Sequence, residues 1–340
     1  MRPTGAFAAA RIPRGLGVGH RLSPYDFAVT SVSASASATA RPTALFVGLC
    51  RLDFTHSLHG GSAATGNDVG ISQVLAPGGP ATSAAVTFAF LGGRSTLLTG
   101  VGRHSSGDFI RDQLRQAGVR LVDAAETDDF KVATSYLRLI PGHPADSTTL
   151  AGTGSRLSPP SSLEALVGES DAVLVDGHHP GLAKAAARAA HERGRPCLLD
   201  GGSWTQITPH LLPYADIAAC SADSRPRDHR RRIPKDILGY LLGSGASWAV
   251  ITDGPRSIRW ASRAHGVQPD IPVPVTEVAD TLGAGDVFYG ALTHAIATRP
   301  VLDDDSFGTA LQFAAGVAAY SCQTFGTRAW MNSWSGSSGH

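Results

Sequence analysis

The chain has 340 residues, of which 42% are hydrophobic and 17% are charged, and its formal net charge is +1. This length and composition are typical of a globular protein with one large α/β domain or two smaller ones. The near-zero charge gives no electrostatic footprint for nucleic acid, and no apolar run reaches the roughly 18–20 residues of a membrane-spanning helix. We therefore expect neither nucleic acid nor a membrane as a partner.

Residues 1–41 differ in composition from the rest of the chain. They are rich in Ala, Ser, Gly and Arg, and Asp26 is their only acidic residue. Such a segment buries too little apolar surface to offset the entropy of ordering, so we predict a disordered extension. Organelle transit peptides share this composition. The same composition would result if the start of the protein had been assigned too far upstream in its gene, and we favour this second interpretation. Residues 331–340 are predicted to be a flexible tail.

The four cysteines are widely spaced and form no Cys-x-x-Cys pair. Most of them lie in apolar stretches, which is typical of small buried hydrophobic side chains in a reducing compartment. We therefore expect a cytoplasmic protein, with organelle import through residues 1–41 left open.

The remainder of the chain alternates short apolar runs with amphipathic segments, which predicts strand–helix units. Such units form a mostly parallel sheet with helices on both faces. Most predicted strands are followed by polar or glycine residues, and this places one large cleft at the carboxyl edge of the sheet. We predict strands at 43–50, 95–99, 131–140, 172–175, 196–199, 215–218 and 248–251, and helices at 83–91, 108–116, 182–193, 235–242, from 286 and from near 306.

The most informative motif is Asp280-Thr-Leu-Gly283-Ala284-Gly285-Asp286, which directly precedes a helix-like run. Small residues on a tight turn let several backbone N–H groups point at one spot, and the helix N-terminus adds its own unpaired N–H groups. The pattern predicts an anion site with a carboxylate, Asp286, beside it. Phosphoryl transfer to an alcohol needs both features, a base and an anion site.

A second glycine site, Gly78-Gly79, precedes the first long helix. Two glycines would bring bare backbone up to a ligand, and the following hydroxyl groups can bind sugar-like alcohols. The alternative is an N-terminal helix cap made by Thr82 or Ser83.

Taken together, these motifs resemble the ribokinase-like, phosphofructokinase-B type carbohydrate kinases, over about residues 44–328. The resemblance implies a three-layer α/β/α sandwich with a mostly parallel central sheet and a small β-lid. It implies one kinase domain at 42–330, with lid segments near 55–75 and 123–150. The motifs that carry it are the two glycine sites above, Leu91-Gly-Gly93, Thr99-Gly-Val-Gly102 and Leu114-x-x-x-Gly118.

The resemblance also assigns roles to individual residues. Asp286 matches the base that takes the proton from the substrate hydroxyl, and the segment 283–286 matches the anion hole. On the sugar side, we expect a contact from Asp53, which we place at the tip of the first strand. We expect further contacts from Gly78, Gly79, Ser83 and His178. On the nucleotide side, we expect contacts from Ser221, Thr252 and Gly254. Asp280 falls where several members bind a monovalent cation, so K⁺ joins Mg²⁺ and ATP as an expected cofactor.

Three departures from the family pattern stand out. The family usually has Asn at the position of Ser83, and often Gly-Asp-Asp where this chain has Gly102-Arg-His104. The Asn-x-x-Glu motif, which helps to organise magnesium and phosphate, is replaced by Ser221-Ala-Asp-Ser224. The adjacent His178 and His179 have three possible interpretations, which are a metal site, a substrate contact or simply polar residues of a loop.

The sequence therefore predicts an ATP- and magnesium-dependent kinase acting on a hydroxyl of a small sugar, with a ketose-like one preferred, and a homodimer through the lid as its assembly. One alternative is a catalytically weak or inactive regulatory protein of the same fold, and another is a nucleoside kinase. A dinucleotide-binding dehydrogenase is disfavoured, because no Gly-x-Gly-x-x-Gly follows the first strand.

Overall fold

The computed structural model describes residues 41–59, 69–125, 129–139, 146–150, 152, 157–224, 234–299 and 301–334. The predictions for residues 1–40 and for residues 335–340 concern parts of the chain outside these ranges. All described residues belong to one compact unit. None of the helices in the described ranges combines the length and the apolar character needed to cross a membrane.

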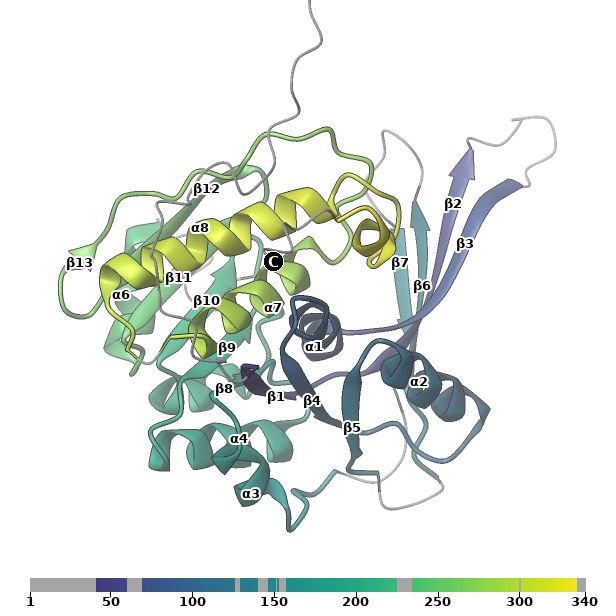
Figure 1. Cartoon of the computed structure of the whole chain (residues 1–340), viewed down its shortest axis with the longest axis horizontal. Helices are drawn as coiled ribbons and strands as arrows, with labels where there is room; N and C mark the ends of the chain where they lie inside the picture. The colour runs from purple at the N-terminus through teal and green to yellow at the C-terminus, as the bar shows by residue number, and fades with distance from the viewer. Residues whose placement is uncertain are drawn as a thin grey trace, which may run out of the picture. The chain divides into compact units, whose positions relative to one another are not determined.

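The main sheet has nine strands in the order β13-β12-β11-β10-β9-β8-β1-β4-β5 (Figure 1). From β11 to β5 all neighbouring strands pair in parallel, and only β12 and β13 add an antiparallel edge. The predicted mostly parallel sheet is therefore confirmed. Its strands are β1 (Thr43–Val47), β4 (Arg94–Thr99), β5 (Val119–Asp123), β8 (Ala172–Val175), β9 (Cys197–Gly201), β10 (Ile217–Ser221), β11 (Trp248–Asp253), β12 (Arg256–Ser262) and β13 (Gly266–Val267).

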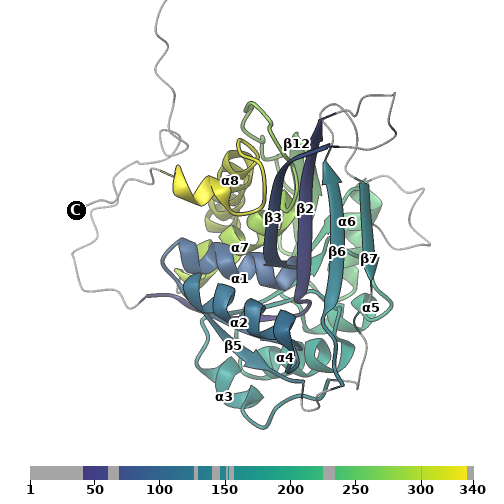
Figure 2. The same cartoon turned by 90° about the vertical axis from the view of Figure 1, so that its right-hand side faces the viewer.

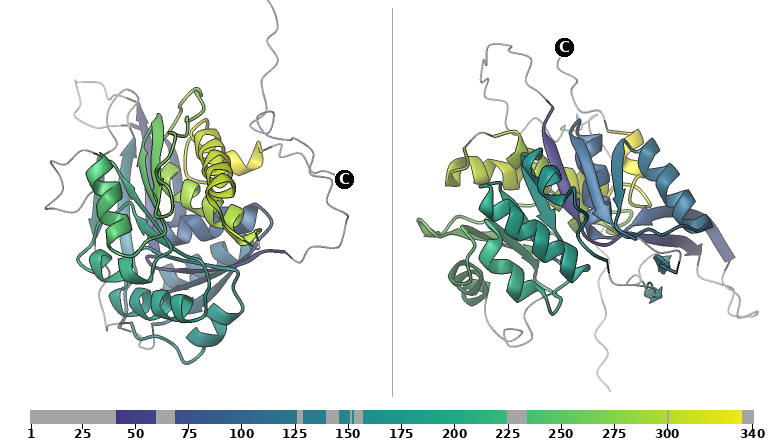
Figure 3. Two further views of the ribbon diagram at one scale, coloured as in Figure 1. Left: turned by 90° about the vertical axis from the view of Figure 1, so that its left-hand side faces the viewer. Right: turned by 90° about the horizontal axis from the view of Figure 1, so that it is seen from below.

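Helices cover both faces of this sheet, as Figures 1 and 3 show. Alternation of side chains along each strand separates two cores. In β1, Phe46 belongs to one core, whereas Leu45 and Val47 belong to the other. The first core includes α1 (Pro80–Phe90), α2 (Ser105–Gln116), α7 (Ala284–Ala297) and α8 (Asp304–Ser321), and the second includes α3 (Leu163–Gly168), α4 (Pro180–Glu192), α5 (Thr208–Leu211) and α6 (Pro234–Gly243).

A separate sheet of four strands, in the order β3-β2-β6-β7, forms the small β-lid of the fold (Figure 2). It consists of β2 (Arg51–His59), β3 (Val69–Gly78), β6 (Ala133–Leu139) and β7 (Asp146–Leu150). The predicted lid bounds need correction. The first segment is longer on both sides than 55–75, because β2 follows β1 almost directly. In the second segment, residue 123 still belongs to β5 of the main sheet.

The C-terminal end of the described chain is more ordered than predicted for residues 331–340. Residues Ala329–Asn332 form a short 3₁₀ helix (η3), and Trp330 is completely buried. The Trp334 ring packs against Tyr320 at 4.7 Å between centroids. These aromatic contacts fix the chain up to residue 334 against α8, because large rings bury much apolar surface.

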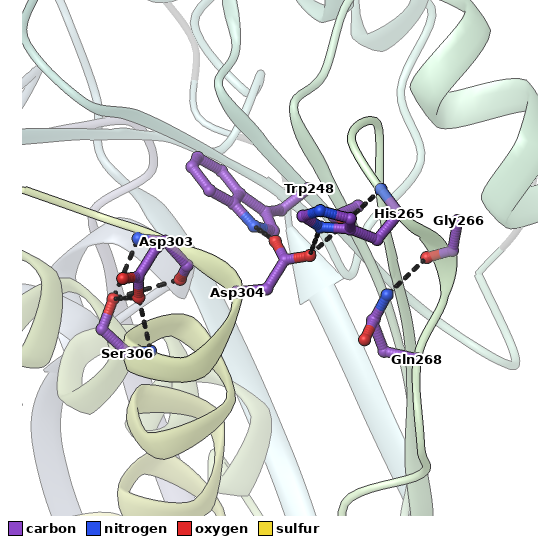
Figure 4. A network of polar contacts seen from close by, with 8 residues as sticks. Trp248, His265, Gly266, Gln268, Asp303, Asp304 and Ser306 are labelled. Atoms are coloured by element: carbon purple, nitrogen blue, oxygen red, sulfur yellow. Dashed lines mark hydrogen bonds and ion pairs between the residues drawn. The ribbon is translucent and has the colours of Figure 1, made fainter.

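The start of α8 is anchored on the antiparallel edge of the main sheet (Figure 4). Asp304 accepts hydrogen bonds from Trp248 Nε1 at 2.9 Å and from Ser262 Oγ at 2.6 Å, and it pairs with His265 Nδ1 at 2.7 Å. The preceding Asp303 caps the helix. This network holds α8, and with it α7, in register with β11 and β12.

Candidate functional site

The motif at residues 280–286 forms a tight turn at the start of α7. Gly283 has φ = 74°, a left-handed conformation that favours glycine, and the helix begins at Ala284. The Ala284 N–H donates to Thr281 O at 3.2 Å, and the Val287 N–H donates to Gly283 O at 2.9 Å. No group in the described ranges accepts from the N–H of Gly285 or Asp286. Two amides at a helix N-terminus are therefore available to an anion.

Asp280 fastens this turn to the C-terminal segment. One of its carboxylate oxygens accepts from Leu282 N at 2.9 Å, and the other accepts from Gly326 N at 3.0 Å. In addition, the Asp280 N–H donates to Cys322 O at 3.2 Å. Asp280 thus has a structural role in the turn. A cation at this carboxylate would share its two oxygens with the two amides.

The carboxyl group of Asp286 lies half-buried in the first turn of α7. Burial raises its pKa to about 6, and the nearby carboxylates of Asp176 and Asp53 add to the increase. The Arg51 guanidinium and a hydrogen bond from the Ser83 side chain act in the opposite direction. The side chains of Ser83 and Asp53 therefore lie close enough to Asp286 to act on it, although the three residues come from three separate elements.

The prediction that Asp53 lies at the tip of the first strand is wrong. Strand β1 ends at Val47, and Asp53 is the third residue of β2 in the small sheet, opposite Ala76 of β3. Its side chain is largely buried and forms an ion pair with Arg51, in which Nε donates to Oδ1 at 2.6 Å. Burial raises the pKa of Asp53, whereas the guanidinium groups of Arg51 and Arg328 lower it. Asp53 thus reaches the site from the lid.

Gly78 and Gly79 are required by close packing within the protein. A Cβ atom on Gly78 would overlap the Asp53 carboxylate. Gly79 has φ = 106°, and a Cβ there would lie 2.5 Å from Leu49 O. Gly79 is also the N-cap of α1 and no side chain caps this helix, so the alternative of a Thr82 or Ser83 cap is wrong.

The N-terminus of α1 is held by Asp176, which directly follows β8. The Asp176 carboxylate accepts from the N–H groups of Leu49 at 2.8 Å, Ala81 at 3.2 Å and His178 at 2.9 Å. A Cβ on Gly48 would overlap this carboxylate. Despite its complete burial, the Asp176 pKa is lowered by the hydrogen bonds and by His178. Asp176 therefore joins β1, α1 and β8 at the edge where the site lies.

His178 lies beside Asp176, with 3.2 Å between Nδ1 and the carboxylate Oδ1. Burial lowers the pKa of His178, but Asp176 and Asp200 outweigh this effect, so the net shift is upward. In His179, burial lowers the pKa. No group of three metal-ligating side chains occurs among residues that the structure describes, so the His178–His179 pair has no third ligand there. The metal interpretation therefore gains no support.

The predicted nucleotide residues lie at the carboxyl edge of neighbouring strands. Ser221 ends β10 and is paired with Thr252 of β11 in the parallel register. Gly254 follows in the turn to β12 with φ = 56°, and a Cβ there would meet nothing within 4 Å. Backbone at this turn is therefore accessible to a ligand.

Sequence reasoning did not assign a role to Arg51 or a definite one to Asp200. Asp200 lies at the end of β9, fully buried, with Oδ1 accepting from Gly202 N at 2.8 Å. Its Oδ2 has no hydrogen-bond partner in the described part of the chain, and burial together with Asp286 raises the Asp200 pKa well above the ordinary value. For Arg51, the i, i+2 spacing from Asp53 was the available signal, because it puts both side chains on one face of a strand.

Comparison with known proteins agrees with this geometry. A family model described as pfkB family carbohydrate kinase matches residues 43–334. The ribokinase of Bacillus subtilis is 24% identical over 291 residues, which are 84% of this chain and 94% of that protein. The fold is similar to Arabidopsis thaliana ribokinase complexed with ribose and ATP (TM-score 0.68, 19% identity, 85% of this chain and 94% of that one). It is also similar to Xylella fastidiosa fructokinase with bound ATP (TM-score 0.70, 20% identity, 85% and 94%).

The family model covers both sheets and the turn that precedes α7. It therefore includes the available amides and the Asp286 carboxyl group as well as the lid strand that carries Asp53. The chain belongs to the pfkB family of carbohydrate kinases, which transfer a phosphoryl group to an alcohol acceptor.

Proposed function

We propose that this kinase transfers the γ-phosphate of ATP to a hydroxyl of a small, ketose-like sugar, with Asp286 as the general base. One observation carries the proposal. The Gly285 and Asp286 amides lack protein acceptors in the described ranges, and they lie at the same helix start as a carboxyl group whose pKa is raised to about 6. A base and an anion site at one place are what this reaction needs.

On the anion side, the turn at 283–286 binds the moving phosphoryl group. Gly285 and Asp286 contribute their available N–H groups, and Gly283 and Ala284 shape the turn that presents them. The left-handed φ of Gly283 turns the chain into α7, and the positive end of the helix dipole lies at the same point. Donors fixed before the reaction stabilise the charge of the transition state without reorganising. Ser221, Thr252 and Gly254 would contact the nucleotide along the neighbouring strand ends.

On the acceptor side, the sugar lies between the lid and the start of α1. Asp53 accepts hydrogen bonds from sugar hydroxyl groups, and Gly78 and Gly79 let the sugar approach the backbone. Ser83 and His178 complete the contacts. A base with a pKa near 6 is mostly ionised at neutral pH yet still takes a proton readily, so Asp286 suits this task.

The described residues offer more direct contacts to the phosphates of ATP than to Mg²⁺. The available amides suit a phosphate, whereas no cluster of three ligating side chains is present in the described ranges. A magnesium ion would therefore be held mainly by phosphate oxygens and water, which is its usual preference at such sites. When bound, it neutralises phosphate charge. For K⁺ we propose the carboxylate of Asp280.

The outer face of the lid supports the proposal of a homodimer. The face of the small sheet opposite Asp53 carries apolar side chains, with exposed fractions of 44% for Tyr136, 58% for Leu150 and 36% for Leu75. Tyr136 stacks on Phe54 at 5.0 Å between ring centroids. Exposed apolar residues grouped on one sheet face are typical of protein interfaces. The four free, buried cysteines support a reducing compartment, for which we propose the cytoplasm.

A substrate-pool assay tests the proposed function. The protein is incubated with ATP, Mg²⁺ and pools of ketoses, aldoses and nucleosides, and ADP is measured together with the mass of the product. We expect ADP release that depends on one sugar, with a product heavier by one phosphoryl group. Nucleotide binding without turnover in any pool would instead favour the regulatory alternative, and turnover only with nucleosides would favour a nucleoside kinase.

A further inference from the structure

Arg51 is the charged residue that the proposed mechanism does not yet use. It occupies the first position of β2, two residues before Asp53, so both side chains project from the same face of the small sheet. Its Nε donates to Asp53 Oδ1 at 2.6 Å, and its side chain is 23% exposed. The two terminal nitrogens of the guanidinium have no partner among the described residues. A cation that is mostly removed from water costs free energy unless nearby charges compensate it.

The charges around Arg51 are those of the proposed active site. Besides Asp53, the guanidinium acts on Asp286, for which it is the strongest influence after burial, and it also acts on His178. Arg51 therefore connects the carboxylate of the lid with the carboxyl group at the start of α7. Asp53 and Asp286 are more than 230 positions apart in the sequence. Asp53 lies on a strand of the small sheet, and Asp286 lies on a helix that packs on the main sheet.

We propose that Arg51 is a positioning residue of the phosphotransfer site, which holds Asp53 in its sugar-binding orientation through their ion pair and supplies the positive charge that acts on the Asp286 carboxyl group. The inference rests on the proposed function, because it takes Asp286 as the base. The inference goes beyond the proposed function because it assigns the electrostatic balance of the site to one side chain of the lid.

The other charged groups at the site cannot replace Arg51. Two carboxylates, Asp53 and Asp176, face Asp286 and oppose its ionisation. Asp200 is a third carboxyl group and supplies no positive charge, and burial together with Asp286 raises its pKa well above the ordinary value.

The other two cationic candidates are already engaged elsewhere. His178 is paired with Asp176 at 3.2 Å. Arg328 donates to Pro77 O at 2.7 Å and acts on Asp53 and Cys50. Arg51 is therefore the cation that offsets two carboxylates at the base.

The experiment compares Arg51→Gln and Arg51→Lys with the wild type, using the acceptor found in the substrate-pool assay. The measured quantity is kcat/KM from pH 5 to pH 9, which reports the ionisation of the free enzyme. For Arg51→Gln we expect the acid limb to move upward by about one pH unit, because a neighbouring opposite charge lowers the pKa of a carboxyl group and its removal reverses that effect. The KM of the sugar should rise about tenfold, since Asp53 loses its partner.

Arg51→Lys separates the two parts of the role. Its ammonium keeps the charge but lacks the planar fork of the guanidinium. The acid limb should therefore stay within a few tenths of a unit of the wild type, whereas the KM of the sugar rises. Arg115→Gln, on the exposed face of α2, is the matched control and should leave both quantities unchanged.

Three outcomes decide the inference. An unmoved acid limb in Arg51→Gln, with nucleotide binding intact, would overturn it while leaving the kinase assignment in place. If Arg51→Gln does not fold, the Arg51→Lys profile decides, because a limb displaced by a full unit despite the retained charge would overturn the electrostatic role. Full turnover of Asp286→Asn would remove the base assignment itself, and that failure is recognised independently of Arg51.

Discussion

Asp53 and Gly78 fit together across the lid. The carboxylate of Asp53 on β2 lies against the α-carbon of Gly78 at the end of β3, so that a Cβ atom at this position would overlap it. The carboxylate that the proposal assigns to sugar binding therefore depends on a missing side chain in the neighbouring strand. Gly78 lies just before the start of α1, so the contact between Asp53 and Gly78 joins the lid to the beginning of this helix.

The first prediction concerns this contact. Gly78→Ala should displace Asp53 and raise the KM of the sugar about tenfold or more, because a misplaced substrate contact is costly even at small displacements. The affinity for ATP should not change. Steady-state kinetics with both substrates varied will measure the two effects separately. Gly316→Ala in α8, where an added Cβ meets nothing within 4 Å, is the control that should leave both constants unchanged.

Gly285 offers a test of the anion site that does not disturb the fold. An added Cβ at Gly285 meets no protein atom within 4 Å, and the residue lies in a regular helix. Gly285→Ala should therefore keep or slightly increase the melting temperature, since Ala favours a helix over Gly by about 1 kcal/mol. Turnover should fall about 10²-fold, because the methyl group occupies the space next to the amides that the phosphoryl group needs. Undiminished turnover would show that no phosphate approaches this turn.

Ionisation of Asp286 should lower the stability of the protein. Its pKa in the folded state, about 6, exceeds the ordinary carboxyl value of 3.8. Stability linked to this group is therefore complete below about pH 4 and is lost as the pH rises through 6. Asp286→Asn should be more stable than the wild type at pH 8 by about 1–3 kcal/mol, and equally stable near pH 3.5. Urea unfolding at the two pH values measures the difference, and a variant less stable at pH 8 would contradict the account.

Asp176 is predicted to matter for the fold rather than for the chemistry. Its carboxylate accepts three backbone hydrogen bonds, from the segment that follows β1, from α1 and from its own loop, whereas Asn has only one side-chain acceptor oxygen. Asp176→Asn should lower the free energy of unfolding by about 2–4 kcal/mol. The lowered Asp176 pKa means that its stabilising effect is present above the unfolded pKa and is lost as the pH falls through the folded one.

The loss caused by Asp176→Asn should therefore shrink in strong acid. Asp270→Asn, at an exposed position, serves as the control in the same unfolding measurements and should change the free energy of unfolding by less than about 0.5 kcal/mol. A loss of the same size at every pH would contradict a charged role for Asp176.

Sequence patterns predicted the central sheet because buried parallel strands are continuous apolar runs. Strand β8 was predicted to the residue, and the start of α7 was predicted two residues late. Strand β5 and the edge strands β12 and β13 were missed. Arginine and other polar residues interrupt the apolar ones in β5 and β12, and β13 has only two residues, so no continuous apolar run marks these strands. The small sheet was expected as a lid, but its strand bounds follow from pairing between distant segments.

The candidate site was predictable where it depends on local chemistry. The turn at 283–286 could be read directly from its glycines. The surroundings of Asp286 could not, because they come from β2, α1 and the loop after β8. The role of Asp176 is a further example. Its hydrogen-bond donors lie up to 127 positions away from Asp176 in the sequence, and no local pattern connects them with it.

Single-turnover kinetics of Asp286→Asn, with ATP and the acceptor sugar both saturating, tests the central claim most directly. Removal of a general base costs about 10²–10⁴ in rate. We expect phosphoryl transfer to slow by this factor at pH 7.5, while the affinity for a fluorescent ATP analogue stays within about twofold. Transfer at the wild-type rate, with the same affinity for nucleotide, would contradict the assignment of Asp286 as the base.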